Sequence, residues 1–160
     1  MSTFSAAKLG AVRALLLSVV FASGVAGCSS FNRDWKAAAG PAPVPPDGIE
    51  GRWEGRWRSE ETRHNDILRC LVSRGTNGVY MARFHAKYWA VFHVSFSYTV
   101  PLTVKQQGDE FEFEGSANLG ALAGGLYTYK GQATATNFVS TYSCKYDHGV
   151  FEMKRPQTAR

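Results

Sequence analysis

Apolar and polar side chains alternate with a period of two from Gly51 almost to the end of the chain. Such alternation places one row of side chains on each face of an extended backbone, so it predicts half-buried β-strands. Eight runs show it, with apolar rows at 53–57, 68–72, 80–86, 92–104, 111–113, 127–129, 138–144 and 151–153. After Gly51 no stretch has a helical period, which predicts a domain built only of strands.

The segments between these runs are short and rich in turn-forming residues. Residues 74–78 contain an Asn-Gly pair, and residues 106–109 and 146–149 each combine Gly with Asp. Connections this short cannot carry parallel crossovers, so neighbouring strands are expected to pair antiparallel. We therefore predict an all-β fold, a closed eight-stranded antiparallel up-and-down barrel over residues 49–156 with a tail at 157–160. A two-sheet β-sandwich is the alternative.

The N-terminal part of the chain has the composition of an export signal. Lys8 and Arg13 give it a basic start without acidic residues, and residues 14–21 form an apolar core. Small residues follow over 22–27 and lead to Cys28. The apolar core is too short to span a bilayer and is typical of a secretory signal peptide.

Residues 25–28, Val-Ala-Gly-Cys, resemble the lipobox of bacterial lipoprotein precursors. The resemblance implies that residues 1–27 are a lipoprotein signal peptide. It also implies that Cys28 becomes the mature N-terminus, carries diacylglycerol on its sulfur and is N-acylated, typically by palmitate. The alternative is an ordinary cleavable signal that happens to end in Cys. Ser29 resembles the sorting pattern that favours the outer membrane, so the expected location is the cell envelope, lipid-anchored on the periplasmic face of the outer membrane.

Residues 28–48 are expected to form the acylated cysteine and a flexible tether. Four prolines between residues 41 and 46 alternate with Ala and Val, which favours extended, polyproline-like conformations. About twenty residues at ~3 Å each would hold the domain up to ~60 Å from the bilayer. Phe31 and Trp35 would then rest on the membrane interface; a disordered tether is the alternative.

Charge argues against a nucleic-acid partner. The chain has 18 Lys and Arg against 13 Asp and Glu, a net charge of +5, and loss of Lys8 and Arg13 with the leader lowers it to +3. No Lys/Arg cluster accompanies this small excess, so we expect no nucleic-acid binding. The expected partners are the membrane, through the lipid anchor, and a small apolar ligand or another envelope protein.

The strand pattern and two residues together resemble the lipocalin (calycin) pattern. Gly51-Arg52-Trp53 opens the first strand and Arg155 ends the last one. The resemblance implies that Trp53 closes the floor of the barrel and that Arg155 lies over its ring as a cation–π partner. Three features depart from the family: the barrel region is short, the C-terminal helix is missing, and Gly55-Arg56-Trp57 repeats the motif, which leaves the register ambiguous.

Two cysteines remain once Cys28 is assigned to the lipid. In an exported domain such a pair is usually bridged, so we predict a disulfide between Cys70 and Cys144. Two buried thiols are the alternative.

The sequence contains no recognisable arrangement of catalytic residues, so we assign no enzymatic activity, no catalytic residue, no metal site and no cofactor. His85 and His93 lie on the polar faces of neighbouring strands, but they lack the spacing of a metal motif. Asp147 and His148 fall in a turn without a nucleophile nearby, which favours a structural role for Asp147.

Aromatic side chains gather on the inward phase of the strands and are the best indication of function. They predict either a pocket for a small hydrophobic or amphipathic ligand, such as a fatty acid, or a filled barrel. A filled barrel would act as a structural or protein-interaction module, for example an inhibitor-type lipoprotein. The candidate pocket residues are Tyr80, Phe84, Phe92, Phe96, Tyr98, Phe113, Tyr127, Tyr129 and Tyr142.

Overall fold

The structure is a computed structural model that describes residues 30–39, 48–89 and 93–157. The predicted leader, Cys28 and the Pro-rich segment 40–47 lie outside the described residues. The strands are β1 (Gly51–Ser59), β2 (Asn65–Arg74), β3 (Val79–Trp89), β4 (His93–Gln107), β5 (Glu110–Asn118), β6 (Leu126–Ala133), β7 (Asn137–Ser143) and β8 (His148–Lys154). Two single 3₁₀ turns, η1 (Thr76–Gly78) and η2 (Ala121–Ala123), lie between strands.

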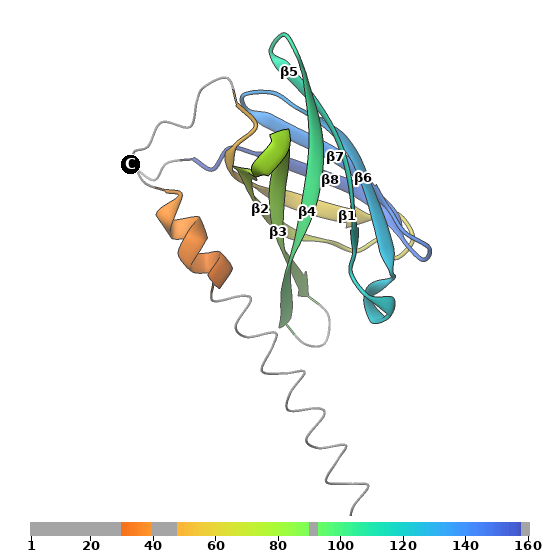
Figure 1. Cartoon of the computed structure of the whole chain (residues 1–160). Helices are drawn as coiled ribbons and strands as arrows, with labels where there is room; N and C mark the ends of the chain where they lie inside the picture. Colours follow the sequence, from red (N-terminus) through yellow and green to blue (C-terminus); the bar gives the residue numbers. More distant parts are fainter. Residues whose placement is uncertain (1–29, 40–47, 90–92, 158–160) are drawn as a thin grey trace, which may run out of the picture.

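These eight strands form one closed barrel in which every strand pairs antiparallel with its neighbours in sequence (Figure 1). The pairing of β1 with β8 closes it, from Glu54 opposite Lys154 to Ser59 opposite Gly149. The predicted all-β up-and-down barrel is thus confirmed and the two-sheet sandwich is excluded. Closure also removes the strand edges, which would otherwise expose unpaired backbone groups.

Two glycines allow the close approach of β1 and β8 that closure needs. A Cβ at Gly55 would overlap the carbonyl oxygen of Glu152 on β8. A Cβ at Gly149 would likewise overlap the carbonyl oxygen of Arg58 on β1. The glycine of the second Gly-Arg-Trp motif therefore has a packing role at the seam of the barrel.

The barrel has two dissimilar ends. We call the end where the chain enters at Gly48 and leaves at Arg155 the closed end. Here Trp53 is fully buried and packs on Phe138, which in turn contacts Phe113 at a ring distance of 4.6 Å. The other end carries the β1–β2, β3–β4, β5–β6 and β7–β8 connections, and we call it the open end.

Residues 30–37 form a helix, the N-terminal helix, that packs on the outside of the barrel wall (Figure 1). Phe31 and Trp35 are four residues apart and therefore share one face of this helix. Phe31 is fully buried and stacks on His85 of β3, with ring centroids 4.7 Å apart. Trp35 lies between the guanidinium groups of Arg52 and Arg69, at 5.1 and 5.2 Å.

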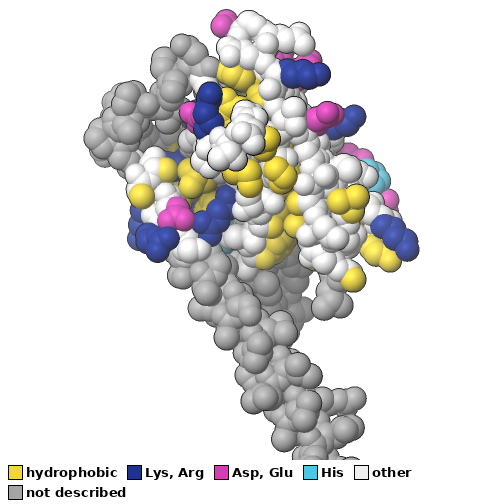
Figure 2. Space-filling model, viewed as in Figure 1, with side chains coloured by type: hydrophobic (Ala, Val, Ile, Leu, Met, Phe, Trp, Pro, Cys, Tyr) yellow, Lys and Arg dark blue, Asp and Glu magenta, His cyan; other side chains and the backbone are white. Residues whose placement is uncertain are grey.

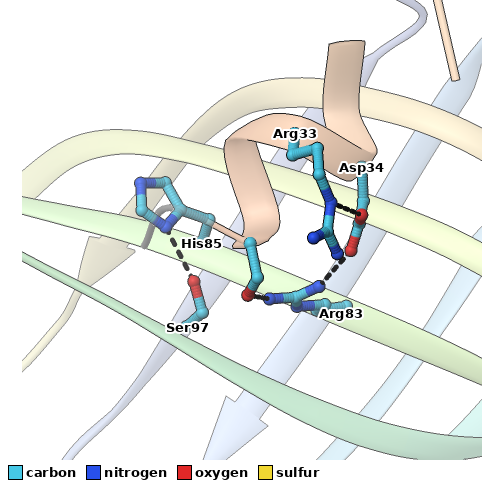
Figure 3. Close-up of polar contacts among 6 residues, drawn as sticks. Arg33, Asp34, Arg83, His85 and Ser97 are labelled. Atoms are coloured by element: carbon cyan, nitrogen blue, oxygen red, sulfur yellow. Dashed lines mark hydrogen bonds and ion pairs between the residues drawn. The ribbon is translucent and has the colours of Figure 1, made fainter. Parts of the chain in front are cut away.

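Polar contacts hold the same helix to β3 (Figure 3). Arg83 forms an ion pair with Asp34 at 2.8 Å and donates a hydrogen bond to the hydroxyl of Ser30. His85 is buried beneath the helix, where its Nδ1 lies 2.8 Å from Ser97 Oγ. The expectation of a flexible tether is therefore wrong for residues 30–37. The physical reason is that the two aromatic residues bury their rings on the arginine side chains of the wall.

The described surface carries mixed charge. On the face drawn in Figure 2, Lys and Arg side chains are interspersed with Asp and Glu. Within the described residues, no helix has the length and apolar character that crossing a membrane requires.

Candidate functional site: an aromatic cavity at the open end

A cavity of about 280 Å³ opens at the end of the barrel opposite Trp53. Six of its lining residues are aromatic and come from five strands: Trp57, Phe96, Tyr98, Tyr127, Tyr142 and Phe151. Their side chains reach the interior because each lies on the inward phase of its strand. The alternation seen in the sequence is therefore the direct cause of the aromatic lining.

The aromatic rings are in mutual contact around this space. Tyr142 packs on Phe151 at 5.0 Å and on Tyr127 at 6.2 Å, measured between ring centroids. On the opposite wall, Tyr98 stacks on Phe96 at 5.8 Å. Offset and tilted contacts at these distances are favourable arrangements of aromatic quadrupoles. The lining is thus a packed and preorganised wall.

Below the cavity, Phe84 and Tyr129 form a second aromatic layer. The Phe84 ring is 5.4 Å from Tyr98 and 5.4 Å from Phe151, and Tyr129 is 6.0 Å from Phe84. This layer fills the middle of the barrel and separates the cavity from the closed end. The interior is consequently hollow at one end and filled at the other.

The hydroxyl of Tyr129 is buried in this layer and makes no hydrogen bond of acceptable geometry within the described residues. Burial raises the pKa of Tyr129, so the hydroxyl is neutral at physiological pH. Burial also raises the pKa of Tyr98, whose hydroxyl interacts with that of Tyr129. A buried polar group with no hydrogen bond costs free energy, which makes this layer a locally unfavourable part of the interior.

Asp147 brings a carboxylate to the rim of the cavity. The hydroxyl of Ser59 donates a hydrogen bond to its Oδ1 at 2.6 Å, and the hydroxyl of Tyr142 donates one to its Oδ2 at 2.9 Å. Burial raises the pKa of Tyr142, and its hydrogen bond to Asp147 raises it further. Ser59 and Tyr142 therefore act as neutral donors that orient the carboxylate.

The structure brings together only some of the predicted pocket residues. Phe96, Tyr98, Tyr127 and Tyr142 line the cavity, and Phe84 and Tyr129 support it from below. The prediction is wrong for Tyr80 and Phe113, which do not line the cavity. Phe92 lies outside the described residues.

The two exceptions lie toward the closed end. Phe113 packs on Phe138 within the filled part of the barrel. Tyr80 pairs with Leu102, and its hydroxyl accepts a hydrogen bond from Arg74 at 2.7 Å. Inward phase alone does not reveal the level of a side chain along the barrel axis, because that level depends on strand register.

Sequence reasoning missed Trp57, Phe151 and Asp147 as site residues. Trp57 and Phe151 share the inward phase of the other aromatic residues, so the pattern contained the signal. Asp147 has no such signal: it follows β7 in a turn, and only the folded chain places it beside Ser59, 88 positions away.

The predicted closure of the barrel by Trp53 and Arg155 is present in the structure. The Arg155 guanidinium lies over the Trp53 ring, 3.7 Å from its centroid. It also donates hydrogen bonds to the carbonyl oxygens of Gly48 and Glu50, both at 2.6 Å. Burial lowers the pKa of Arg155 to about 10, so the group is still protonated at neutral pH.

The predicted disulfide is absent from the structure, where Cys70 and Cys144 are both free thiols. Cys70 lies in the middle of β2, opposite Trp53 and Phe84, whereas Cys144 follows the end of β7. By the shorter way around the wall, β1 and β8 stand between them, which makes three strand steps of about 4.8 Å. A disulfide needs Cα atoms within about 7 Å, so this register does not allow one.

A larger hollow of about 440 Å³ lies on the outer wall over β4 to β7. It is lined largely by solvent-facing polar side chains such as Lys105, Glu112 and Lys130. It therefore lacks the enclosed aromatic walls of the open-end cavity. Among the residues that the structure describes, no group of three or more His, Cys, Asp or Glu is placed to hold a metal ion.

Comparisons with family models, with curated proteins and with solved structures find no match to the chain. The lipocalin-like and lipoprotein resemblances therefore stay predictions, and the function is argued from the cavity.

Proposed function

We propose that the protein binds a small hydrophobic or amphipathic molecule in the open-end cavity. One observation carries the proposal: a space of about 280 Å³, walled by six aromatic side chains, lies at the end of a barrel whose other end is filled. Ligand sites in proteins are typically concave and mostly apolar, with a few placed polar groups. Asp147 and the tyrosine hydroxyls supply the polar groups here.

The size of the cavity limits the ligand. Its volume is close to the lower end of the usual range for small-molecule sites, about 300 Å³. At about 30 Å³ for each water molecule displaced, it accommodates a compact ligand of about ten non-hydrogen atoms. A long fatty acyl chain would not be enclosed, because Phe84 and Tyr129 fill the space below.

The filled middle and closed end fit the alternative of a structural or protein-interaction module equally well. The hollow open end does not, because a barrel that serves only as a scaffold has no need to leave a cavity between its aromatic side chains. We therefore favour ligand binding over a purely structural role.

Binding can be tested by isothermal titration calorimetry on the mature chain with 3-phenylpropan-1-ol, a neutral compound of matching size. Ala86 lines the cavity, so Ala86→Phe should fill it and abolish saturable binding. Ala135→Phe, at an exposed position of the β6–β7 connection, is the matched control and should bind as the parent does. Absence of saturable binding to the parent, or equal binding to both variants, would refute the proposal.

We also propose that this barrel is a lipid-anchored protein of the cell envelope, facing the periplasm from the outer membrane. The lipobox-like residues 25–28 and the export-type leader support this location. Because the N-terminal helix is packed on the barrel, Cys28 lies only two residues from a segment held to β3. The anchor would then hold the barrel wall close to the bilayer.

Metabolic labelling with palmitate tests the anchor. The parent chain should incorporate the label and fractionate with membranes, whereas Cys28→Ala should do neither. Cys144→Ala is the control, because that thiol belongs to the folded domain and its loss should leave labelling unchanged. Label retained by the Cys28→Ala variant would contradict lipidation at this position.

A further inference from the structure

The described lining of the open-end cavity contains an acidic side chain but no basic one. Among the described residues that line it, Asp147 is the only acidic one, and none is Lys, Arg or His. The tyrosines do not add charge, because burial raises the pKa of Tyr98, Tyr127 and Tyr142 alike. A ligand that enters this space therefore meets one carboxylate and otherwise neutral walls.

The Asp147 carboxylate has neutral partners only. Its two oxygens accept hydrogen bonds from the hydroxyls of Ser59 and Tyr142. Within the described part of the chain it forms no ion pair, and the neighbouring His148 contacts Glu60 and Glu61 instead. The two hydroxyls orient the carboxylate but do not neutralise it, so a cation at the rim would gain a direct electrostatic partner.

The aromatic walls favour the same charge. The faces of Trp, Tyr and Phe rings are electron-rich and attract a cation placed within about 6 Å of the ring centroid. Trp57, Tyr142 and Phe151 line the cavity together with Asp147. A cluster of aromatic side chains beside a carboxylate is a chemical environment suited to an ammonium group and unsuited to an anion.

We propose that the ligand of the open-end cavity is an organic cation, an amine or quaternary ammonium compound with a compact apolar body. Its cationic group lies against Asp147 and the rings of Trp57 and Tyr142, and its apolar part contacts Tyr98 and Phe96. The inference rests on the proposed binding function and narrows it, because it excludes carboxylates such as fatty acids as preferred ligands.

Three probes of nearly identical shape test which ligand charge the cavity prefers: 3-phenylpropylammonium, 3-phenylpropan-1-ol and 3-phenylpropionate. Calorimetric titration of the mature chain should show the ammonium compound binding about tenfold more tightly than the alcohol. The carboxylate should bind most weakly. An alcohol or carboxylate that binds as tightly as the ammonium compound would overturn the cation proposal and leave the binding function intact. No saturable binding of any probe would overturn both.

The Asp147→Asn variant tests whether the Asp147 carboxylate causes the preference for a cation. It should bind the ammonium compound and the alcohol with affinities that differ by less than about threefold. Glu61→Gln, which removes an exposed carboxylate at the same end, is the control and should keep the full preference. Tyr142→Phe keeps the Asp147 charge, so it should still bind the ammonium compound more tightly than the alcohol. This variant is a second check if Asp147→Asn does not fold. A preference that persists without the Asp147 charge, or that disappears in Glu61→Gln, would contradict the assignment.

Discussion

Two tryptophans on β1 show how differently one sequence motif is used at the two ends of the barrel. Trp53 and Trp57 each follow Gly-Arg, and both point inward. Each indole also donates a hydrogen bond to a backbone carbonyl, Trp53 to Ile49 at 2.8 Å and Trp57 to Lys87 at 3.1 Å. Locally the two residues are therefore equivalent.

Their surroundings are not equivalent. Trp53 is covered by Arg155 and packs on Phe138, so it fills the closed end. Trp57 borders the cavity and stacks on His64 from the β1–β2 connection, 5.5 Å away. The comparison teaches that the closed end is organised for packing and the open end for access. Each prediction below tests a part of that division.

The largest expected effect is that of Trp53→Ala. Removing a fully buried indole leaves a cavity under Arg155, and the free energy of unfolding should fall by about 4 kcal/mol. Trp57→Ala should cost less, about 2 kcal/mol, because part of its ring already faces empty space. Urea denaturation followed by circular dichroism measures both. Equal losses, or a larger loss at Trp57, would contradict the division between the ends.

Arg155→Met should lower the free energy of unfolding by about 2–3 kcal/mol. The variant keeps an apolar stem over Trp53 but leaves the carbonyl oxygens of Gly48 and Glu50 without their donor. Lys154→Met, at the exposed neighbouring position, is the control and should change stability by less than about 0.5 kcal/mol. Thermal and urea unfolding of both variants measure the difference, and similar values would show that closure does not depend on the guanidinium.

Two tyrosines, one in the layer below the cavity and one lining it, should respond in opposite directions to loss of their hydroxyl. Tyr129→Phe removes a buried hydroxyl that makes no hydrogen bond of acceptable geometry among the described residues. It should raise the free energy of unfolding by up to about 1 kcal/mol. Tyr142→Phe removes the donor to Asp147 and should lower it by about 1 kcal/mol. Denaturant titration distinguishes the two signs. A clear loss in Tyr129→Phe would show that its hydroxyl has a partner in solution.

The smallest effect concerns His85, on the wall between the two ends. Burial lowers the pKa of His85, with the nearby charges of Arg69, Lys87 and Arg83 acting in the same direction, while the Asp34 carboxylate of the N-terminal helix is already paired with Arg83. The folded state thus resists protonation that the unfolded chain accepts. The contribution of the neutral His85 to stability is fully present above its unfolded pKa of about 6.5. It is lost as the pH falls through the lower pKa of the folded state.

The free energy of unfolding of the His85→Gln variant should depend less on pH over this range. Unfolding free energies of parent and variant, measured from pH 8 to pH 5, should diverge below about pH 6.5, with the parent losing more. All other histidines are the same in both proteins, so the difference between the two curves isolates His85. Parallel curves would contradict the buried position of the imidazole under Phe31.

Much of the fold was predictable because alternation is a local property. All eight strands lie where period two predicts them, and Glu110, Glu112 and Glu114 face solvent as the alternate phase requires. The lipocalin-like resemblance implied the contact between Trp53 and Arg155, but the repeated Gly-Arg-Trp motif left the register ambiguous. Less of the site was predictable: inward phase identified aromatic residues that line the cavity, but it also included Tyr80 and Phe113.

The errors have a common physical cause, which is that local patterns carry no information on distant pairing. Phe31 and Trp35 are four residues apart in a segment next to several prolines, and contacts with the barrel wall make a helix there favourable. These contacts include the arginines of β1, β2 and β3. Cys70 and Cys144 share the inward phase, yet the register separates them by three strand steps.

The sequence by itself determined the number of strands, their antiparallel order and the rows of side chains that face inward, because each depends on neighbouring residues. Only the tertiary structure decided which of two identical motifs closes the barrel, where the interior remains hollow, and that Asp147 stands at the rim of an aromatic cavity. These features depend on strand register and on closure between β1 and β8, which join residues about a hundred positions apart. A period of two cannot encode such contacts, because it is unchanged when a whole strand slides by two residues.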